Sequence, residues 1–110
     1  MEDIYIAAGM RSALGNFGGS LKDRPMTDLA AEVTRATIER AGASTEDFDH
    51  MVFTTTCPTD RDSLFAARVV GMKSGLPADA GALDISRACA SGLQAILAAG
   101  QQVATGHSRL

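Results

Sequence analysis

Strand-like and helix-like segments alternate three times along this sequence, and that alternation limits the possible folds more than any other feature. The predicted strands are 3–9, 51–56 and 80–86, and the predicted helices are 28–42, 64–75 and 89–104. Strands that alternate with helices favour a parallel sheet, because each helix carries the chain back to the start of the next strand. The pattern therefore predicts an α/β fold with a parallel or mostly parallel sheet and helices on its faces.

The ends of the predicted helices carry recognisable signals. Thr27 is a good N-cap for the first helix, and Gly42 can supply its left-handed end. Gly75, before Pro77, is the expected stop of the second helix, and Gly106 that of the third. Helical periodicity predicts the inward-facing residues as Leu29, Ala30, Val33, Ala36 and Ala41, then Leu64, Ala67, Val70 and Gly71, then Leu93, Ile96, Leu97 and Val103.

Composition excludes several classes of protein. The chain has 110 residues, of which 45% are hydrophobic and 21% charged, as in ordinary globular domains. A net charge of −3 without a Lys/Arg cluster argues against nucleic acid as a partner. No apolar run is long enough to span a membrane, and the acidic start is unlike a signal peptide, so we expect a cytoplasmic protein. Cys57 and Cys89 are then expected to be free thiols, and no metal site is predicted.

Cys89 is the residue with the clearest chemical potential. It follows a predicted strand and opens a predicted helix, where unpaired N–H groups and the helix dipole stabilise a thiolate. Its neighbours Ala88, Ala90, Ser91 and Gly92 are small, so a substrate could approach the sulfur. A strand, a sharp turn, a nucleophile and a helix form the layout of a nucleophile elbow. The alternative is that Cys89 is a small buried hydrophobe, as free cysteines often are.

Two segments resemble the thiolase family. "SRACASGLQAILAAGQQVATG" resembles its nucleophile segment, in which a cysteine, a small residue, Ser and Gly open a buried helix. "RSALGNFGGSL" resembles its opening turn and glycine loop. The matching positions are Cys89, Ser91, Gly92, Leu93, Arg11, Gly15, Phe17, Gly18 and Gly19. The segments between them fall in the expected order, so the resemblance covers essentially residues 1–110 and implies an incomplete thiolase N-terminal domain in a layered fold.

The resemblance implies acyl transfer on coenzyme A in fatty-acid metabolism. Cys89 would take the acyl group as a thioester, and its backbone N–H would belong to an oxyanion hole. Acyl-CoA and coenzyme A would be substrates, with no separate cofactor. Thiolases form dimers through the strand that precedes the nucleophile, here "GALDIS", which implies a homo-oligomer for the full-length protein. The residues that bind the acyl chain are not identified.

The other family residues are not found in the sequence. Thiolases activate the cysteine with a His in a Gly-His-Pro motif and use a Cys in a Cys-x-Gly motif as acid and base, and neither motif occurs here. His107 is followed by Ser108, and we expect it to be a solvated tail residue. His50 is expected to be exposed in a polar connection, and Cys57 to be an ordinary loop thiol. Arg11 is expected to tie the first loop to the body of the protein.

The sequence also departs from the family pattern. Ser86 replaces a frequent Asn, Ala13 replaces a usual Pro, and "TTTCP" follows the second strand where a Gly-Asn-Val-like stretch is usual. We therefore expect a divergent N-terminal portion of a thiolase that is inactive alone. The alternatives are a non-catalytic α/β interaction module or remnant, and a portion of a condensing enzyme of the ketoacyl-synthase kind.

Overall fold

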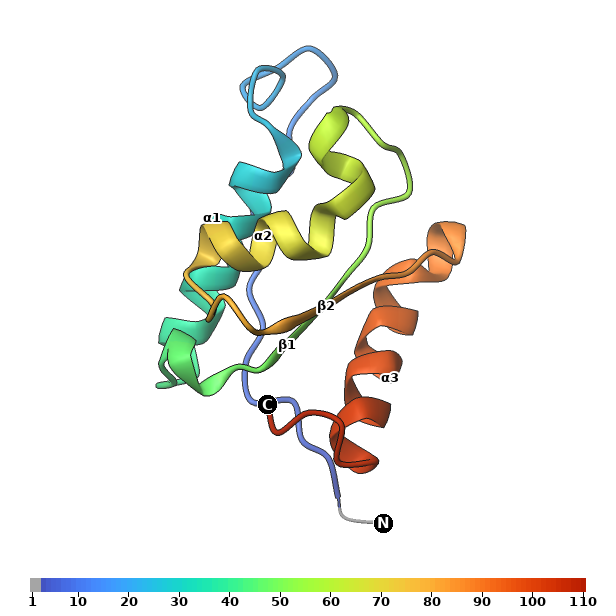
Figure 1. Cartoon of the computed structure of the whole chain (residues 1–110). Coiled ribbons are helices and arrows are strands. Elements are labelled where there is room, and N and C mark those ends of the chain that lie inside the picture. The colour runs from blue at the N-terminus through green and yellow to red at the C-terminus, as the bar shows by residue number, and fades with distance from the viewer. Residues whose placement is uncertain (1–2) are drawn as a thin grey trace.

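A computed structural model of the chain describes residues 3–110. The elements are α1 (Met26–Arg40), the 3-10 turn η1 (Thr45–Asp47), β1 (His50–Phe53), the 3-10 turn η2 (Arg61–Phe65), α2 (Ala66–Ser74), β2 (Gly81–Asp84), the 3-10 turn η3 (Ala88–Ala90) and α3 (Ser91–Ala104). Figure 1 shows α1 and α2 on one side of the two strands and α3 on the other. The predicted α/β class with a parallel sheet and helices on its faces is confirmed.

The sheet has two strands within the described residues, and they pair in parallel. His50 lies opposite Gly81, and Phe53 opposite Asp84. Successive side chains of a strand point to opposite faces, so β1 turns Met51 toward α2 and His50 toward α3. The two faces are therefore covered by different helices, and both strands end at the edge where the Cys89 segment begins.

The first predicted strand does not form. Residues 3–9 are extended but pair with no strand, and Ile4, Tyr5 and Ile6 are exposed. A cavity of about 620 Å³ lies between this segment and β1, and its lining includes Tyr5 and Val52. Paired strands lie about 4.8 Å apart, so the backbone groups across this gap cannot meet. The prediction of a strand at 3–9 is wrong for this structure for that reason.

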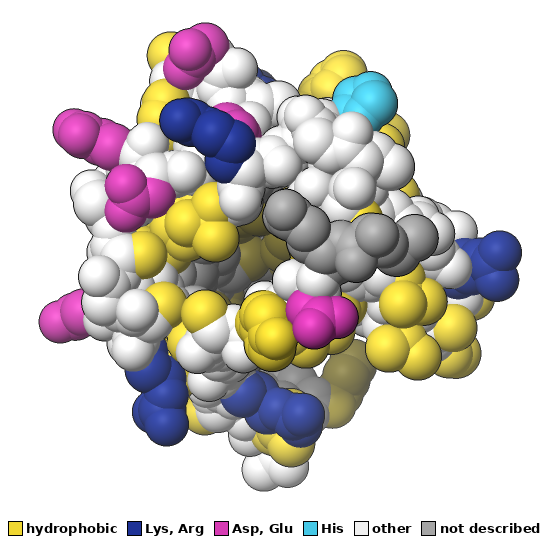
Figure 2. All heavy atoms as spheres, turned by 90° about the horizontal axis from the view of Figure 1, so that it is seen from below, with side chains coloured by type: hydrophobic (Ala, Val, Ile, Leu, Met, Phe, Trp, Pro, Cys, Tyr) yellow, Lys and Arg dark blue, Asp and Glu magenta, His cyan; other side chains and the backbone are white. Residues whose placement is uncertain are grey.

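Apolar side chains gather around the end of the molecule at which the two termini lie. Figure 2 looks at this end and shows hydrophobic side chains around a hollow. The cavity beside the N-terminal segment is lined by apolar residues of α1 and β1, including Ile38 and Met51, and by Phe48 between η1 and β1. A small cluster of Ile38, Leu76 and Ala80 is well buried next to it. The core is therefore continuous with an open apolar surface.

Helix α1 begins earlier and faces a different direction than the sequence suggests. Pro25 is its N-cap residue, and Thr27 is a buried helical residue rather than the cap. Its buried positions are Thr27, Ala31 and Ile38, whereas Val33 on the predicted inward face is only half-buried. The physical reason is that α1 packs against α2, while the N-terminal segment on its other side stands away. Gly42 has a φ of +69° and ends the helix as predicted.

Polar contacts also join α1 to α2. Lys73 Nζ donates to Thr27 Oγ1 at 2.8 Å and to Asp28 Oδ1 at 2.6 Å, and Arg35 donates to the carbonyl of Lys73 at 2.5 Å. Asp28 lies in the first turn of α1 and Lys73 in the last turn of α2, so each charge also suits the dipole of its own helix. These contacts fix the two helices side by side.

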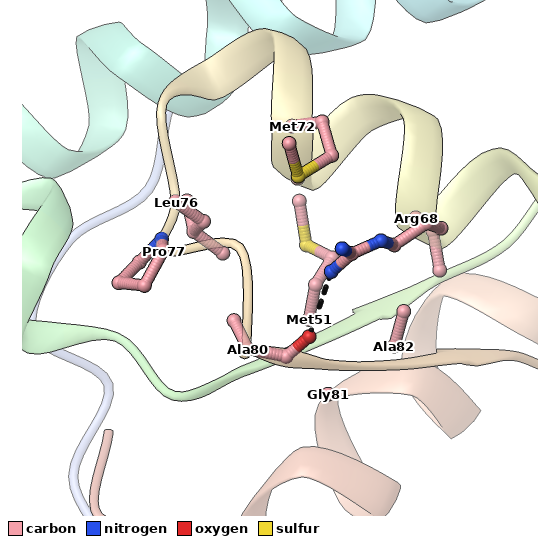
Figure 3. A pocket seen from close by; sticks show the side chains of 10 residues that line it. Met51, Arg68, Met72, Leu76, Pro77, Ala80, Gly81 and Ala82 are labelled. Atoms are coloured by element: carbon pink, nitrogen blue, oxygen red, sulfur yellow. Dashed lines mark hydrogen bonds between the residues drawn. The ribbon is translucent and has the colours of Figure 1, made fainter.

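Helix α2 lies directly on the sheet. Ala67, Val70 and Gly71 are buried as predicted, but Leu64 lies in η2 and is 70% exposed. Gly75, with a φ of +91°, ends the helix as predicted. Figure 3 shows the close packing of α2 against Met51 and the chain before β2.

The exposed side chain of Arg68 also joins α2 to this chain. Its guanidinium donates to the carbonyls of Ala80 and Ala78, at 3.0 and 2.6 Å, and Figure 3 shows the first of these bonds. Arg68 therefore fastens the segment that leads into β2.

Helix α3 shows its most apolar face to solvent. Ala98 is half-buried beside β1, whereas Leu93, Ile96 and Leu97 are more than half exposed. The prediction that Leu93, Ile96 and Leu97 face inward is wrong here, because α3 contacts the sheet with its alanine and glutamine side. An apolar helix face normally packs against another element, and none among residues 3–110 covers this one.

Candidate active site

Cys89 lies in a tight turn between strand and helix. β2 ends at Asp84, the chain is extended through Ser86, Ala88–Ala90 forms η3, and α3 starts at Ser91. The predicted order of strand, turn, cysteine and helix is confirmed, with the helix starting two residues after the cysteine. Cys89 is exposed and forms no disulfide. The buried-hydrophobe interpretation of Cys89 is therefore wrong for this structure.

The turn is sharp because of one residue in an unusual conformation. Ala88 has a φ of +48°, and it is the one non-glycine residue with positive φ among residues 3–110. This left-handed conformation is costly for a residue with a Cβ. Ala90 N donates to Arg87 O at 3.0 Å, and Ser91 N donates to Ala88 O. Cys89 is thus at the tip of a closed loop.

A buried serine hydroxyl closes the same loop. Ser91 is 2% exposed, and its Oγ accepts a hydrogen bond from the backbone N–H of Arg87 at 2.7 Å. The sequence places Ser91 in a family motif but predicts no role for its hydroxyl. A serine in the first turn of a helix that follows a tight turn is the signal for such a bond.

The strand that leads to Cys89 is anchored by Asp84, a residue for which the sequence predicts no role. Its Oδ1 accepts from the backbone N–H of Ala67 at 2.8 Å, at the start of α2. The first N–H groups of a helix lack partners within the helix, so this carboxylate satisfies one of them. Asp60 caps η2 rather than α2, because its Oδ1 accepts from Ser63 N at 3.0 Å.

Space beside the sulfur is open. A Cβ built on Gly92 would meet no atom within 4 Å, and Ala88 and Ala90 are exposed. The pocket drawn in Figure 3 is lined by other residues and does not include Cys89. The site is consequently an exposed thiol on a rigid turn rather than a cavity.

Neither histidine accompanies Cys89. His50 is half-buried in β1, so the prediction of an exposed histidine is wrong: β1 begins one residue earlier than expected and turns the imidazole toward α3. His107 is exposed after the end of α3, as predicted. Both line one hollow with Gln101 and Thr105, near the C-terminal end of α3. A helix of 14 residues is about 21 Å long, and Cys89 lies at its other end.

The glycine loop is not part of this site. Residues 17–24 form turns before the N-terminal end of α1, and Figure 1 shows them well apart from the start of α3. Gly18 has a φ of +68°, which a turn of this kind needs. Arg11 is exposed and makes no hydrogen bond within residues 3–110, so the expected tie to the body of the protein does not form.

Among residues 3–110, no three His, Cys, Asp or Glu side chains come together as metal ligands would. Within the same residues, no helix has the length and apolar character required to cross a bilayer. Cys57 is exposed in the loop after β1, as expected of an ordinary loop thiol.

The fold and the site define an α/β protein with a cysteine at a strand-to-helix elbow. Residues 4–110 match the family described as thiolase, N-terminal domain, and the chain belongs to that family. Beta-ketothiolase BktB of Cupriavidus necator is 38% identical over 105 residues, which are 96% of this chain and 27% of that protein. The mitochondrial 3-ketoacyl-CoA thiolase of Bos taurus is 32% identical over 110 residues, which are 100% of this chain and 28% of that protein.

Solved structures agree with this assignment. Human mitochondrial 3-ketoacyl-CoA thiolase in complex with CoA superposes with a TM-score of 0.89 at 31% identity, over 93% of this chain and 26% of that one. Acetyl-CoA acetyltransferase from Syntrophomonas wolfei gives a TM-score of 0.84 at 33% identity, over 93% and 26%. The chain thus spans about a quarter of the length of the relatives that it matches.

Proposed function

We propose that this chain supplies the nucleophile of a thiolase-type acyltransferase and that Cys89 is that nucleophile. The Cys89 thiolate attacks the thioester carbonyl of an acyl-CoA. A new bond forms between Sγ and the acyl carbon, the carbon–sulfur bond to coenzyme A breaks, and coenzyme A leaves as its thiolate. In the synthetic direction, the carbanion of a second acetyl-CoA then takes the acyl group from Cys89. In the degradative direction, Cys89 instead attacks the keto carbonyl of a 3-ketoacyl-CoA, the adjacent carbon–carbon bond breaks, acetyl-CoA leaves, and coenzyme A then takes the acyl group. Covalent catalysis of this kind divides one difficult step into two.

One observation carries the proposal: Cys89 is exposed at the tip of the turn between β2 and α3. The start of a helix offers N–H groups to a thiolate and to a developing oxyanion. A Cβ built on Gly92 would meet no atom within 4 Å, so the backbone three residues from Cys89 is open to a substrate. The names of the relatives, which include acetyl-CoA and 3-ketoacyl-CoA, support CoA thioesters as the substrates.

We propose further that the 110 residues support the first acyl transfer at most. A general base must lie within hydrogen-bond reach of the proton that it removes. His50 and His107 both lie near the opposite end of α3, and Cys57 follows β1. Residues that lie elsewhere in longer thiolases would then have to complete the reaction cycle.

Intact-mass spectrometry after incubation with acetyl-CoA tests the proposed nucleophile. We expect one acetyl adduct on the unaltered chain and on Cys57→Ala, and none on Cys89→Ala. Peptide mapping would place the adduct. An adduct that persists in Cys89→Ala, or that is absent from the unaltered chain, would contradict the proposal for this chain. The second outcome would favour a non-catalytic module.

Compartment and assembly complete the proposal. We propose the cytoplasm as the compartment, although the bovine and human relatives are mitochondrial, and fractionation of the source cells tests this. We also propose that the full-length protein pairs through β2, whose outer edge has no strand partner within residues 3–110. Exposed strand edges favour pairing with another chain. Sedimentation of the full-length protein and of a variant with Pro at Ala82 tests this assembly.

A further inference from the structure

We propose that Ser91 is a positioning residue for Cys89: its buried hydroxyl holds the turn closed so that the thiol stays at the head of α3. This inference rests on the proposed function for the role of Cys89 as a nucleophile, whereas the hydrogen bond of Ser91 is a feature of the structure itself. Ser91 is 2% exposed and lies two residues after the thiol. Its Oγ accepts from Arg87 N at 2.7 Å, on the other side of Cys89 in the sequence.

The turn needs such a constraint because its backbone is strained. Ala88 has a φ of +48°, a conformation that a residue with a Cβ adopts only when its surroundings impose it. The carbonyl of Arg87 accepts from Ala90 N at 3.0 Å, and the N–H of Arg87 donates to Ser91 Oγ. Both backbone groups of Arg87 are therefore held by residues that follow Cys89. Both hydrogen bonds close around Ala88 and Cys89.

Within the described residues, no other side chain performs this task. α3 has no side-chain cap from its N-cap residue, Ala90. Its first residue therefore contributes the one side-chain hydrogen bond found at this end of the helix within residues 3–110. Replacing Ser91 by Ala removes the acceptor and leaves the Arg87 N–H without its partner, whereas Thr keeps a hydroxyl at the same carbon. The effect should consequently depend on the hydroxyl rather than on side-chain volume.

The experiment compares two thiols in the same tube. The purified chain is treated with iodoacetamide, and peptide mapping over time gives the ratio of the alkylation rates of Cys89 and Cys57. Cys57 lies in a loop outside the turn and serves as the internal reference. The variants are Ser91→Ala and Ser91→Thr. Ser74→Ala is the matched control, because Ser74 is also 2% exposed and its Oγ also bonds a backbone group, Val70 O at 2.6 Å.

We expect Ser91→Ala to lower the ratio about tenfold, because the alkylation rate of a thiol depends on its access and on the groups that surround its sulfur. Ser91→Thr should restore the ratio, and Ser74→Ala should leave it unchanged. A ratio that Ser91→Ala does not lower would overturn the proposal. So would an equal fall in Ser74→Ala, which would indicate a general loss of stability, or a failure of Thr to rescue.

Acetylation separates this inference from the proposed function. If the ratio responds as expected while acetyl-CoA leaves no adduct, the positioning role stands and the acyltransferase proposal fails for this chain. If Cys89 is acetylated while Ser91→Ala leaves the alkylation ratio unchanged, the acyltransferase proposal stands and the positioning role is refuted.

Discussion

His50 occupies the space in which any residue other than glycine at position 81 would place its side chain. A Cβ at Gly81 would lie 2.5 Å from His50 Nδ1, well inside van der Waals contact. The two residues are partners in the parallel register of β1 and β2. The imidazole is held between β2 and α3, and its Nε2 has no hydrogen-bond partner within residues 3–110. The sheet that leads to Cys89 therefore depends on a glycine at the first residue pair of its two strands.

Gly81→Ala is expected to destabilise the chain by about 1–3 kcal/mol, because overpacking forces the ring or the strand to shift. Urea unfolding measures the effect. In a double-mutant cycle, His50→Ala removes the ring, and the penalty of Gly81→Ala should then fall by about 1 kcal/mol or more. Gly92→Ala, whose Cβ meets no atom within 4 Å, is the matched control. Additive effects of the two changes would show that the ring and the Cβ do not collide.

Asp84→Ala is expected to lower the free energy of unfolding by about 1–2 kcal/mol, since the N–H of Ala67 loses its carboxylate acceptor at the start of α2. Asp84→Asn keeps an acceptor oxygen and should cost less. Asp79→Ala is the control, because Asp79 is exposed and makes no hydrogen bond within residues 3–110. Equal effects of the Asp84 and Asp79 substitutions in urea unfolding would refute the anchoring role.

Ala88→Gly is expected to raise the free energy of unfolding by about 0.5–1 kcal/mol. Glycine adopts the left-handed conformation without the penalty of a Cβ, and this gain exceeds the entropy that glycine adds to the unfolded chain. Ala90→Gly, at a residue with a φ of −89°, should not stabilise. Thermal and urea unfolding of the two variants compare them directly. A loss of stability in Ala88→Gly would mean that the turn does not hold Ala88 in a strained conformation.

Local signals in the sequence predicted local structure well. Gly42, Gly75 and Gly106 end the three helices with positive φ, as their sequence positions predict. These features depend on a few neighbouring residues, so the sequence contains them in full. The elbow at Cys89 was predictable for the same reason, because small residues between a strand and a helix allow few other paths.

Features that depend on distant partners were not predictable. The segment at 3–9 has the composition of a strand, yet it pairs with nothing across the cavity beside β1. Leu93 and Ile96 have helical spacing, but periodicity gives the direction of an apolar face and not the element that covers it. Asp84 reaches α2 only because the fold brings residues 67 and 84 together.

Asp49 should make the stability of the chain depend on acid pH. Hydrogen bonds from Ser108 Oγ at 2.5 Å and from Arg109 N hold the pKa of Asp49 well below its usual range, although partial burial opposes them. As the pH falls, the unfolded state binds a proton before the folded state does, at about pH 4. The stability that Asp49 contributes is therefore present above that pH and is lost as the pH falls toward the lowered pKa. In urea unfolding from about pH 6 to pH 3, the free energy of unfolding should fall less steeply with acid for Asp49→Asn than for the unaltered chain.

The exposed carboxylate of Asp23 is the comparison for this effect, because it makes no hydrogen bond within residues 3–110. Asp23→Asn should keep the acid dependence of the unaltered chain. Identical profiles for Asp49→Asn and Asp23→Asn would show that the C-terminal residues Ser108 and Arg109 do not stabilise the fold through Asp49.

The apolar face of α3 should make the 110-residue chain self-associate. Leu93 is 66% exposed, and Ile96 and Leu97 are each 52% exposed. Burying a side chain of this size is worth about 1.5–3 kcal/mol, so two copies gain by covering these residues against each other. Sedimentation velocity should show concentration-dependent oligomers.

Ile96→Glu should shift the distribution toward monomer, because a buried, unpaired charge is unfavourable. Gln101→Glu adds the same charge at an exposed position of α3 and should leave the oligomers intact. A monodisperse monomer that melts cooperatively would contradict this expectation, and an equal response to both substitutions would show that net charge rather than this face controls association.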